Sequence, residues 1–559
     1  MECSPHREFV AFDRISVNRP VGLGVLLGLG FLAGLLLVIL LIQLRGIQLH
    51  YQYYLTTGGE NLQVYGVWKA QEGHPLYVWP NRDFFQLTLY NFGFYHLYAA
   101  ILNCLHARGP FIMLYGRYLT AAFAVAGMFA QTRLLYFLTG DFRTRRMGAA
   151  IWLVSFCTWF NSYFPGYYPI SVRPDIVAVA VSTMGLYLFM VYVVTGRQRW
   201  VLAAAAAWTV TWCFKQSDVM LLFGAGVYLL ITRRISAAVV LALTFAIPIS
   251  LILGLGSAEY RWNILFAPTV NALSLFNGAR LLLDGMLKSL FVWSFLVTLP
   301  LLYYYHGRSN RGRSWLKMLL AGLPAGGLFS TIKALAIVVL CAIPPSFLSL
   351  SKTGSSLNHM FEVFVAATTL SFVVALELGS RLTAQSSHRL GMVVGLTIFS
   401  MGAFPVGQLA LNRMGPMVRA SAADQVRKEE FSIFLKSLNP PVFIEDDIYS
   451  LPWQCNDNRY PSIMLDHVFY DAAKVHGRLC GGVEQLIACH WFATLYLAQD
   501  SPYCKLAIAA NYSPQPLAAK FSHCLDSLGR ESPPLVLFSA PPGAAGTNGF
   551  HSLLSLSEK

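Results

Sequence analysis

Long apolar runs fill the first three quarters of this sequence and constrain its fold more than any other feature. A helix needs about 20 apolar residues to cross the roughly 30 Å hydrocarbon core of a bilayer. Eleven runs approach or exceed this length, at 20–43, 111–138, 147–163, 176–195, 200–214, 218–232, 235–255, 287–305, 328–348, 360–379 and 390–409. The chain is 55% hydrophobic and only 12% charged, which excludes an ordinary soluble enzyme. We therefore predict a mainly α, polytopic membrane bundle of about 11 spans.

Short basic clusters separate these runs. They contain Arg143, Arg145 and Arg146; Arg197 and Arg199; Arg233 and Arg234; Arg308, Arg311, Arg313 and Lys317; and Arg381 and Arg389. With a cytoplasmic N-terminus, and with the aromatic stretch 87–105 flat on the outer surface, every cluster falls on the cytoplasmic side, as short basic loops do in membrane proteins. This topology explains the net charge of +14 without a nucleic-acid partner, because no basic cluster is combined with a soluble scaffold and interleaved aromatics.

The last quarter of the chain has a different composition. Fourteen of the 27 Asp and Glu residues follow residue 423. The runs PPVFIEDD (440–447), KLAIAANY (505–512) and PLVLFSAPP (534–542) predict short strands, whereas YDAAKVHG (470–477) and VEQLIACHWFATLYL (483–497) have helical spacing. We predict a transmembrane domain over residues 1–410 and a small extracytoplasmic α/β domain over residues 411–559.

Carboxylates at the membrane boundary are candidate site residues, because an acid there costs free energy unless it is paired or functional. On the predicted outer side these acids are Glu60, Glu72, Asp83, Asp175, Asp218, Glu259, Asp284 and Glu362. Glu60 follows two glycines and begins a stretch with apolar residues at helical spacing. This pattern fits a short helix on the membrane surface with its acid directed at a cavity. The alternative is that Glu60 only stabilises the helix start through the macrodipole.

Two further outer segments carry charge next to a span. Arg173 and Asp175 directly precede an apolar run, where Asp175 either caps the helix that starts after Pro174 or belongs to a site. Lys215 lies between two spans. It either extends toward lipid head groups or presents a fixed positive charge to a phosphate.

A fourth polar segment begins a later span. It contains Asn358, His359 and Glu362, and Glu362 lies one helical turn after Asn358. Because all four segments face the same compartment in the predicted topology, we expect them to line one polar cavity.

The order of these motifs resembles that of the GT-C superfamily, integral-membrane glycosyltransferases that use lipid-linked sugars. The acid after the first span is followed by G-HPLY-x5-D, YNFGFY, GRYLTAAFAV, RPD and FKQ. The resemblance covers about residues 20–410 and is greatest to the bacterial branch with the lipid A aminoarabinose transferase and protein O-mannosyltransferases. It implies a GT-C-like fold and a polyprenyl-phosphate sugar donor.

The resemblance also implies roles for individual residues. The family's first-loop acids, often Asp-Glu, fall on Gly59 and Glu60, so the first acid is missing and Glu60 would act alone or with Asp83. The Asp that begins a later span in relatives matches Asp175. These are the implied catalytic carboxylates.

The donor phosphate has implied ligands too. Lys215 matches a Lys that helps to hold this phosphate in the family, and Arg117 matches an Arg common at the start of the second span. Arg117 could instead pack against Asp83 or Glu60. We add Arg173 as a phosphate ligand. The residues expected to bind substrate are Tyr90, Asn91, Gln216, Asn358, His359 and Glu362.

These residue types fit sugar transfer from polyprenyl phosphate. The departing phosphate gathers negative charge while the sugar becomes oxocarbenium-like, so fixed cations would stabilise the transition state. A carboxylate, with Glu60 the first candidate, would act as general base and give inversion. The enzyme would be a hexosyl- or pentosyltransferase of the inner (plasma) membrane, with a lipid, glycan or protein acceptor and membrane lipids around it. The one candidate cofactor is a divalent metal ion.

Two other functions use the same features differently. A flippase or transporter of lipid-linked saccharides would be expected to have repeated halves and ionisable residues at mid-span, whereas here the polar residues collect at the outer ends and no repeat is visible. A non-catalytic scaffold would leave the four polar segments without a common purpose.

Overall fold

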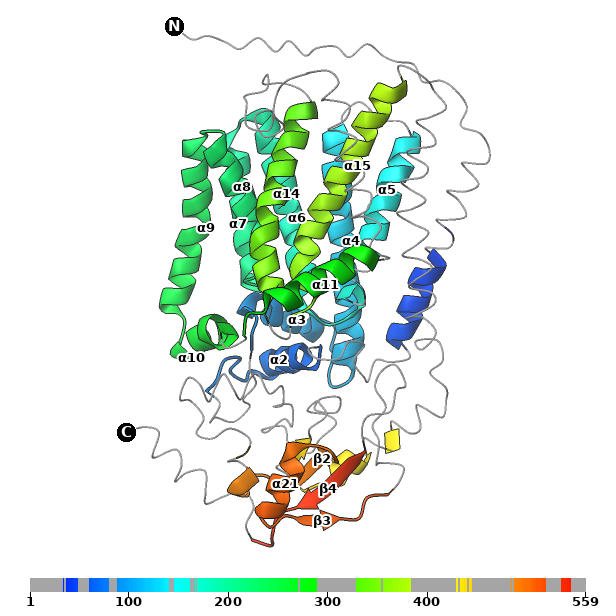
Figure 1. Cartoon of the computed structure of the whole chain (residues 1–559), viewed down its shortest axis with the longest axis vertical. Helices are drawn as coiled ribbons and strands as arrows, with labels where there is room; N and C mark the ends of the chain where they lie inside the picture. Colours follow the sequence, from blue (N-terminus) through cyan, green and yellow to red (C-terminus); the bar gives the residue numbers. More distant parts are fainter. Residues whose placement is uncertain are drawn as a thin grey trace.

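The computed structural model describes most of the apolar part of the chain and part of the C-terminal region (Figure 1). The described residues are 34, 37–48, 60–79, 88–139, 145–160, 166, 168–269, 272–288, 328–352, 355–383, 429–430, 433–439, 442–444, 484, 487–518 and 534–543. The predicted spans at 20–43, 287–305 and 390–409 lie wholly or mostly outside these residues, as do Asp83 and the predicted domain boundary at 410.

Helices follow the other predicted apolar runs. They are α4 (Phe111–Thr139), α5 (Arg145–Phe160), α6 (Pro174–Thr195), α7 (Gln198–Phe214), α8 (Met220–Ile231), α9 (Ile235–Leu255), α14 (Leu328–Leu350) and α15 (Phe361–Thr383). Among the described residues, five segments are long and apolar enough to cross a membrane: α4, α6, α9, and the parts Thr331–Leu350 and Leu357–Val374. The chain is a polytopic helical membrane protein, as its sequence predicts.

The helix α6 lies at the centre of this bundle, packed between α4 and α7. Apolar residues cover almost its entire circumference, which is typical of a helix buried on all sides. The buried Trp208 ring packs against Gly185 of α6, and the buried Trp159 ring packs against Gly127 of α4 and Phe361 of α15. In contrast, α9 packs on one edge of the bundle and exposes most of its apolar side chains, such as Leu243 and Leu251, as a lipid-facing helix would.

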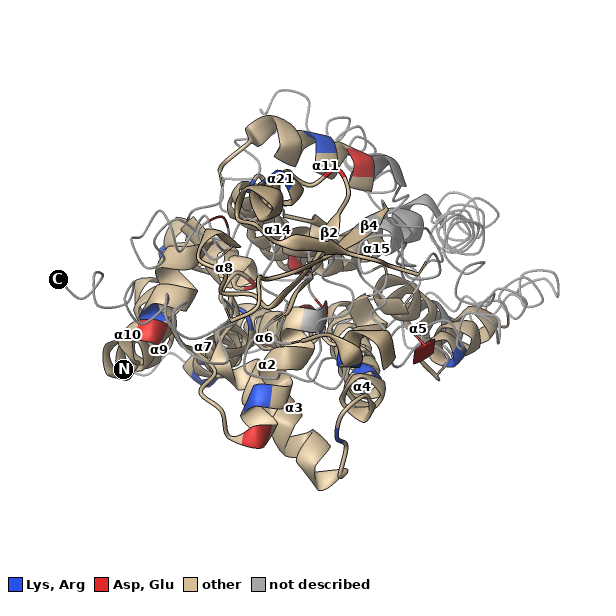
Figure 2. Cartoon of the chain, turned by 90° about the horizontal axis from the view of Figure 1, so that it is seen from below, with Lys and Arg blue, Asp and Glu red and all other residues tan. Residues whose placement is uncertain are grey.

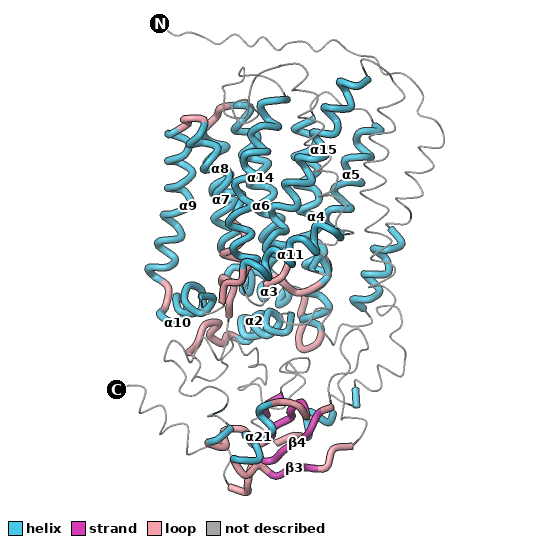
Figure 3. Tube along the Cα trace, in the orientation of Figure 1, coloured by secondary structure: helices cyan, strands magenta, loops and turns pink. Residues whose placement is uncertain are grey.

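Short helices form a layer across one end of the bundle (Figures 1 and 3). The layer contains α2 (Glu60–Glu72), α3 (Phe92–Cys104), α10 (Ala258–Arg261) and α11 (Leu275–Lys288). The helix α3 has 13 residues and packs against α2 and the end of α7. This length and position fit the prediction that the aromatic stretch 87–105 does not cross the membrane.

A small sheet follows in the C-terminal region. Its strands are β1 (Val442–Ile444), β2 (Thr494–Ala498), β3 (Ser513–Gln515) and β4 (Leu535–Ser539), in the order β1-β2-β4-β3. Strand β1 is parallel to β2, and β4 is antiparallel to both of its neighbours. Val442 and Tyr496 of the sheet share a buried cluster with Tyr65 of α2, so the sheet packs on the helical layer.

Two sequence predictions for this region are wrong. The run KLAIAANY was predicted as a strand, but residues up to 509 belong to helix α21 (Pro502–Ala509), because the Ser501 hydroxyl caps the Tyr503 amide at 3.1 Å and Pro502 occupies the first turn. The run VEQLIACHWFATLYL was predicted as a helix, but its second half forms β2. Pairing with both β1 and β4 outweighs the helical spacing there.

The basic clusters gather at the opposite end of the bundle from the short helices. Because the helices alternate in direction, the α6–α7 turn with Arg197 and the α8–α9 turn with Arg234 lie at the same end, as do the start of α5 at Arg145 and the last turn of α15 at Arg381. The predicted common side of these described clusters is confirmed.

Candidate active site

Glu60 and Arg117 form a fully buried ion pair. The Arg117 Nε and Nη2 atoms donate to Oε1 and Oε2 of Glu60, each at 2.9 Å, and the Val172 amide donates to Oε1 at 2.8 Å. Neither side chain is accessible to solvent. The pair joins the start of α2 to α4 and to the loop before α6. The predicted packing of Arg117 against Glu60 is thus present.

Asp175 is the centre of a second polar cluster at the same end of the bundle. Its Oδ1 atom accepts hydrogen bonds from Lys215 Nζ and Asn358 Nδ2, both at 2.7 Å, and its Oδ2 atom accepts one from Arg173 Nε at 3.1 Å. Asp175 lies in the first turn of α6, Lys215 directly after α7 and Asn358 directly before α15. Three of the four predicted polar segments therefore meet here.

Lys215 lies between two carboxylates. Its ammonium contacts Asp175 Oδ1 at 2.7 Å and Asp218 Oδ1 at 2.8 Å. Burial acts to lower the pKa of Lys215, but these two carboxylates outweigh it, so the pKa is raised and the lysine stays charged. Burial also raises the pKa of the Asp218 carboxyl to about 6; the Lys215 charge opposes this rise and the Asp175 charge adds to it.

The second cation of the cluster is held by an aromatic ring. The guanidinium of Arg173 lies 4.5 Å from the centre of the Tyr168 ring. The Tyr168 hydroxyl shares a hydrogen bond of 2.8 Å with Ser356, which in turn donates to Asn358 at 2.7 Å. Burial acts to lower the pKa of Arg173, but Tyr168 and Asp175 outweigh it, so the pKa is raised. Both cations of the cluster are therefore fixed in position and permanently charged.

Glu362 adjoins this cluster from the first turn of α15. Its carboxylate accepts hydrogen bonds from the Ser182 hydroxyl of α6 and from the Met220 amide, the latter at 2.8 Å. The Trp208 indole donates to Ser182 at 3.0 Å. The Glu362 carboxylate thus accepts from the Met220 amide, which as the first amide of α8 has no acceptor within the helix, and it links α6, α8 and α15.

The predicted substrate-binding residues of the first loop connect it to α7. Asn91 donates to the Trp212 carbonyl and accepts from the Tyr260 hydroxyl at 2.7 Å, and Gln216 donates to the Leu89 carbonyl at 2.6 Å. Tyr90 interacts electrostatically with Asp175, and burial raises its pKa. The structure therefore places Tyr90 beside the Asp175 cluster and Asn91 within the layer of short helices.

Three buried polar atoms of this region have no hydrogen-bond partner among the described residues. They are Asp218 Oδ2, Gln216 Oε1 and His359 Nδ1. Sequence reasoning placed Asp218 on the outer side but gave it no role. Its spacing of three residues from Lys215 was the available signal. Ser182 was also missed, since a serine within an apolar run gives no sign of its partner.

The residues of this cluster do not fit a divalent metal ion. Among the described residues, no three His, Cys, Asp or Glu side chains lie close enough to hold one. The Lys215 ammonium, 2.8 Å from Asp218, occupies the place where a cation would bind. The cations of this cluster are therefore its own side chains, Lys215 and Arg173.

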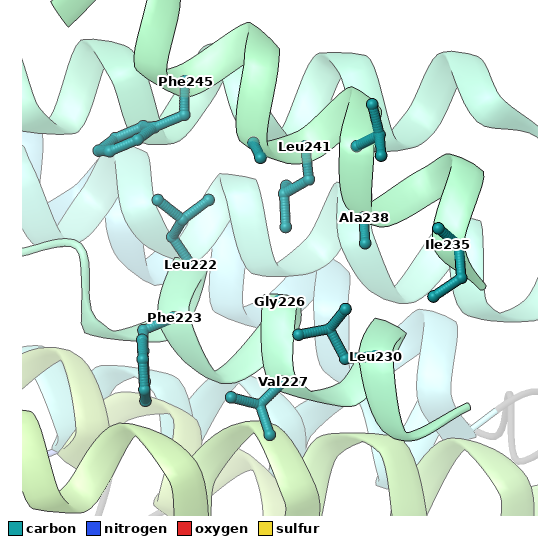
Figure 4. Close-up of a pocket in the computed structure, with 11 residues that line it drawn as sticks. Leu222, Phe223, Gly226, Val227, Leu230, Ile235, Ala238, Leu241 and Phe245 are labelled. Carbon is teal, nitrogen blue, oxygen red and sulfur yellow. The ribbon is translucent and has the colours of Figure 1, made fainter. Parts of the chain in front are cut away.

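An apolar groove lies on the lipid-facing side of α8 and α9 (Figure 4). It has a volume of about 450 Å³. Leu222, Gly226 and Leu230 line it from α8, and Ile235, Leu241 and Phe245 from α9. Its lining begins two residues after Met220, whose amide binds Glu362. The lining thus runs along α8 from Leu222, near the polar cluster, to the α8–α9 turn, and along the first half of α9.

Comparison with known proteins adds to this picture. No protein family model and no curated protein matches the chain. Two solved structures of ArnT from Cupriavidus metallidurans are similar over 93% of this chain at 14% sequence identity. ArnT bound to undecaprenyl phosphate has a TM-score of 0.55 with 99% of its chain covered, and ArnT in the apo state has a TM-score of 0.56 with 100% covered. ArnT is a GT-C glycosyltransferase, so this chain has a GT-C-like fold.

Proposed function

We propose that this protein is a membrane glycosyltransferase that moves a sugar from a polyprenyl-phosphate donor to an acceptor hydroxyl. The observation that carries the proposal is the pair of fixed cations, Lys215 and Arg173, both bound to Asp175 at one end of the bundle. The ArnT structure of the same fold contains undecaprenyl phosphate, which supports a lipid phosphate as the ligand.

The charges of the cluster suit a phosphodiester donor. Lys215 and Arg173 keep their positive charge at physiological pH, because Asp175 and Asp218 raise the pKa of Lys215, and Tyr168 and Asp175 raise that of Arg173. Such cations are held where negative charge develops as the sugar leaves the phosphate. The lysine ammonium has three donors, and two of them bind Asp175 and Asp218. We assign the third to a phosphate oxygen of the donor.

The apolar groove gives the donor's chain a place to lie. Its lining carries no charged side chain, and Figure 4 shows only hydrocarbon atoms on the drawn residues. A polyprenyl chain that lies in the groove with its far end toward the α8–α9 turn would bring its phosphate to Met220 and Asp218. We assign the groove to this chain.

The positions of the basic clusters indicate on which side of the membrane the reaction takes place. The described clusters lie at the end of the bundle opposite to Lys215 and Asp175. The short helices at the site end carry acidic as well as basic residues (Figure 2). Basic loops favour the cytoplasmic face. We infer a plasma-membrane protein that reacts at the outer face, with a cytoplasmic N-terminus and an extracytoplasmic C-terminal sheet.

A transporter of lipid-linked saccharides is the alternative. It would place ionisable residues near the middle of the membrane. Here Asp175 and Glu362 occupy first turns of their helices, and Lys215 lies beyond the end of α7. This placement favours the enzyme.

The test is sugar transfer by the purified full chain in lipid nanodiscs. Polyprenyl-phosphate hexose and pentose donors, radiolabelled in the sugar, are combined with lipid, glycan and peptide acceptors, and release of polyprenyl phosphate is measured together with the anomeric configuration of the product. We expect turnover with inversion, reduced at least 100-fold in Lys215→Ala and in Asp175→Asn. Glu259→Gln is the matched control, since its carboxylate lies outside the cluster. Turnover that is equal in all four proteins would reject the proposal.

A further inference from the structure

One carboxylate oxygen in the polar cluster is buried without a hydrogen-bond partner among the described residues. Both oxygens of Glu60, Asp175 and Glu362 accept hydrogen bonds, whereas Asp218 uses only Oδ1, which contacts Lys215 Nζ at 2.8 Å and Ser217 Oγ at 3.1 Å. Asp218 is only 2% exposed, and its Oδ2 atom is left unsatisfied. Such an atom costs free energy unless a ligand or water completes it.

The surroundings of Asp218 indicate what that ligand is. Lys215 holds the other oxygen, so Oδ2 lies within a few ångströms of the ammonium that would bind the donor phosphate. Gln216 Oε1 and His359 Nδ1 are also buried polar atoms without a partner in the part of the chain that the structure describes. An unsatisfied carboxylate oxygen beside the Lys215 ammonium suits a ligand that brings a hydroxyl donor, as a sugar or a hydroxyl acceptor does.

We infer that Asp218, rather than Glu60, is the general base that takes the proton from the acceptor hydroxyl. This inference rests on the proposed glycosyltransferase function. Glu60 is held by two hydrogen bonds from Arg117 and one from Val172, so proton uptake there would break a buried ion pair. Asp218 can accept a proton on Oδ2 while Oδ1 keeps its contact with Lys215.

The reaction balances with no added reactant. The acceptor oxygen forms a bond to the anomeric carbon, and its proton moves to Oδ2 of Asp218. The bond between the anomeric carbon and the phosphate oxygen breaks, and its electron pair stays on the phosphate. The phosphate thereby gains one negative charge as Asp218 loses one. The charge next to Lys215 is unchanged, which keeps the cost of the step low in a buried site.

The acid limb of the pH profile should report Asp218. The charged groups that face it are Lys215 on its own loop, Asp175 on α6 and Glu362 on α15. Burial raises the pKa of Asp218 to about 6. The base must be ionised to act. The transfer rate at saturating donor should therefore rise as the pH increases through about 6 and then level off.

The experiment separates chemistry from donor binding in the full chain in nanodiscs. Transfer is measured between pH 5 and 8 with whichever polyprenyl-phosphate sugar the wild type uses, and undecaprenyl phosphate serves as the binding probe in native mass spectrometry. Asp218→Asn should lower the transfer rate about 100-fold or more and remove the limb near pH 6. Its affinity for undecaprenyl phosphate should be unchanged or higher, because a negative charge near the phosphate is gone. Asp218→Glu should recover part of the rate, and the control Glu259→Gln should behave like wild type.

Each other result counts against the inference. Wild-type rates in Asp218→Asn would exclude Asp218 as the base. A loss of rate in both Asp218 variants, together with a loss of undecaprenyl phosphate binding, would mean that Asp218 only positions Lys215. If the wild type transfers no sugar from any donor, the proposed function fails first and this inference fails with it.

Discussion

The Glu60 carboxylate faces the Arg117 guanidinium in a bidentate contact, with both N···O distances at 2.9 Å and neither group exposed to solvent. The Val172 amide completes the coordination of Glu60. Breaking a buried pair by removing one partner leaves an uncompensated charge, whereas replacing both partners by apolar residues is often tolerated. The contact therefore fastens the first outer loop to the bundle.

We expect Glu60→Gln to destabilise the protein by roughly 3–5 kcal/mol, because Arg117 would remain charged and buried. Thermal unfolding of the detergent-solubilised protein, followed by tryptophan fluorescence, measures the change. The double variant Glu60→Leu with Arg117→Met should recover much of the lost stability. A double variant that is as stable as wild type but transfers sugar at least 100-fold more slowly would contradict a purely structural role for this pair and would count against Asp218 as the general base. A stable single variant would contradict the structural role.

Lys69 predicts a pH dependence of stability. This residue of α2 is fully buried, and burial lowers its pKa from 10.5 to about 7. The unfolded chain binds the proton more strongly, so the free energy of unfolding should rise as the pH increases from about 7 to 10.5. Over this pH interval the free energy of unfolding should rise by roughly 5 kcal/mol.

Lys69→Met removes this dependence. In the wild type the Lys69 Nζ atom donates to the Leu76 carbonyl at 2.6 Å. That carbonyl also accepts from the Thr88 hydroxyl, so the carbonyl keeps a partner in the variant. We expect a higher melting temperature at pH 7 and a flatter profile between pH 7 and 10. A variant that melts earlier than wild type at pH 7 would show that the charged amine is stabilising.

Gly93 sets the distance between α3 and α7. A Cβ atom at this position would lie 2.7 Å from the Cys213 carbonyl oxygen, and backbone cannot rotate away. Gly93→Ala should cost about 1–3 kcal/mol and lower turnover, because Leu89 and Gln216 meet across the same contact. Gly254→Ala in α9 is the control, since nothing lies within 4 Å of its Cβ position. Equal melting temperatures for the two variants would contradict this close approach.

The sequence predicts the spans well and their partners poorly. Apolar length is a local property, so helices such as α6 and α9 lie where the runs predict them. Strand β2 is not local. The strand with which it pairs, β1, lies about 50 residues earlier in the chain, and this pairing overrides a helical pattern.

For the candidate site too, the sequence predicts the position of each residue better than its partners. Sidedness correctly brings Asp175, Lys215 and Asn358 to one end, because helix direction follows from the number of crossings. The partner of each acid is not predictable in this way. The Arg117 contact of Glu60 spans 57 residues, and the free oxygen of Asp218 depends on which neighbours leave it unpaired. These are properties of packing rather than of spacing.

The groove between α8 and α9 predicts a dependence on the length of the donor chain. Gly226 lines the groove, and the nearest atom to a Cβ added there is Leu241 Cδ2 at 4.0 Å. Gly226→Phe should fill part of the cavity of about 450 Å³ without displacing backbone.

If the polyprenyl chain lies here, the KM for an 11-isoprene donor should rise about tenfold, equivalent to roughly 1.4 kcal/mol. The KM for a one-isoprene donor should change less than twofold, since its short chain ends before Gly226, which lies about 9 Å along α8 from Met220. Gly254→Phe projects from α9 into open space and is the matched control. An equal rise in KM for both donors would mean that the substitution acts on the polar cluster, and no rise for either would place the chain elsewhere on the bundle.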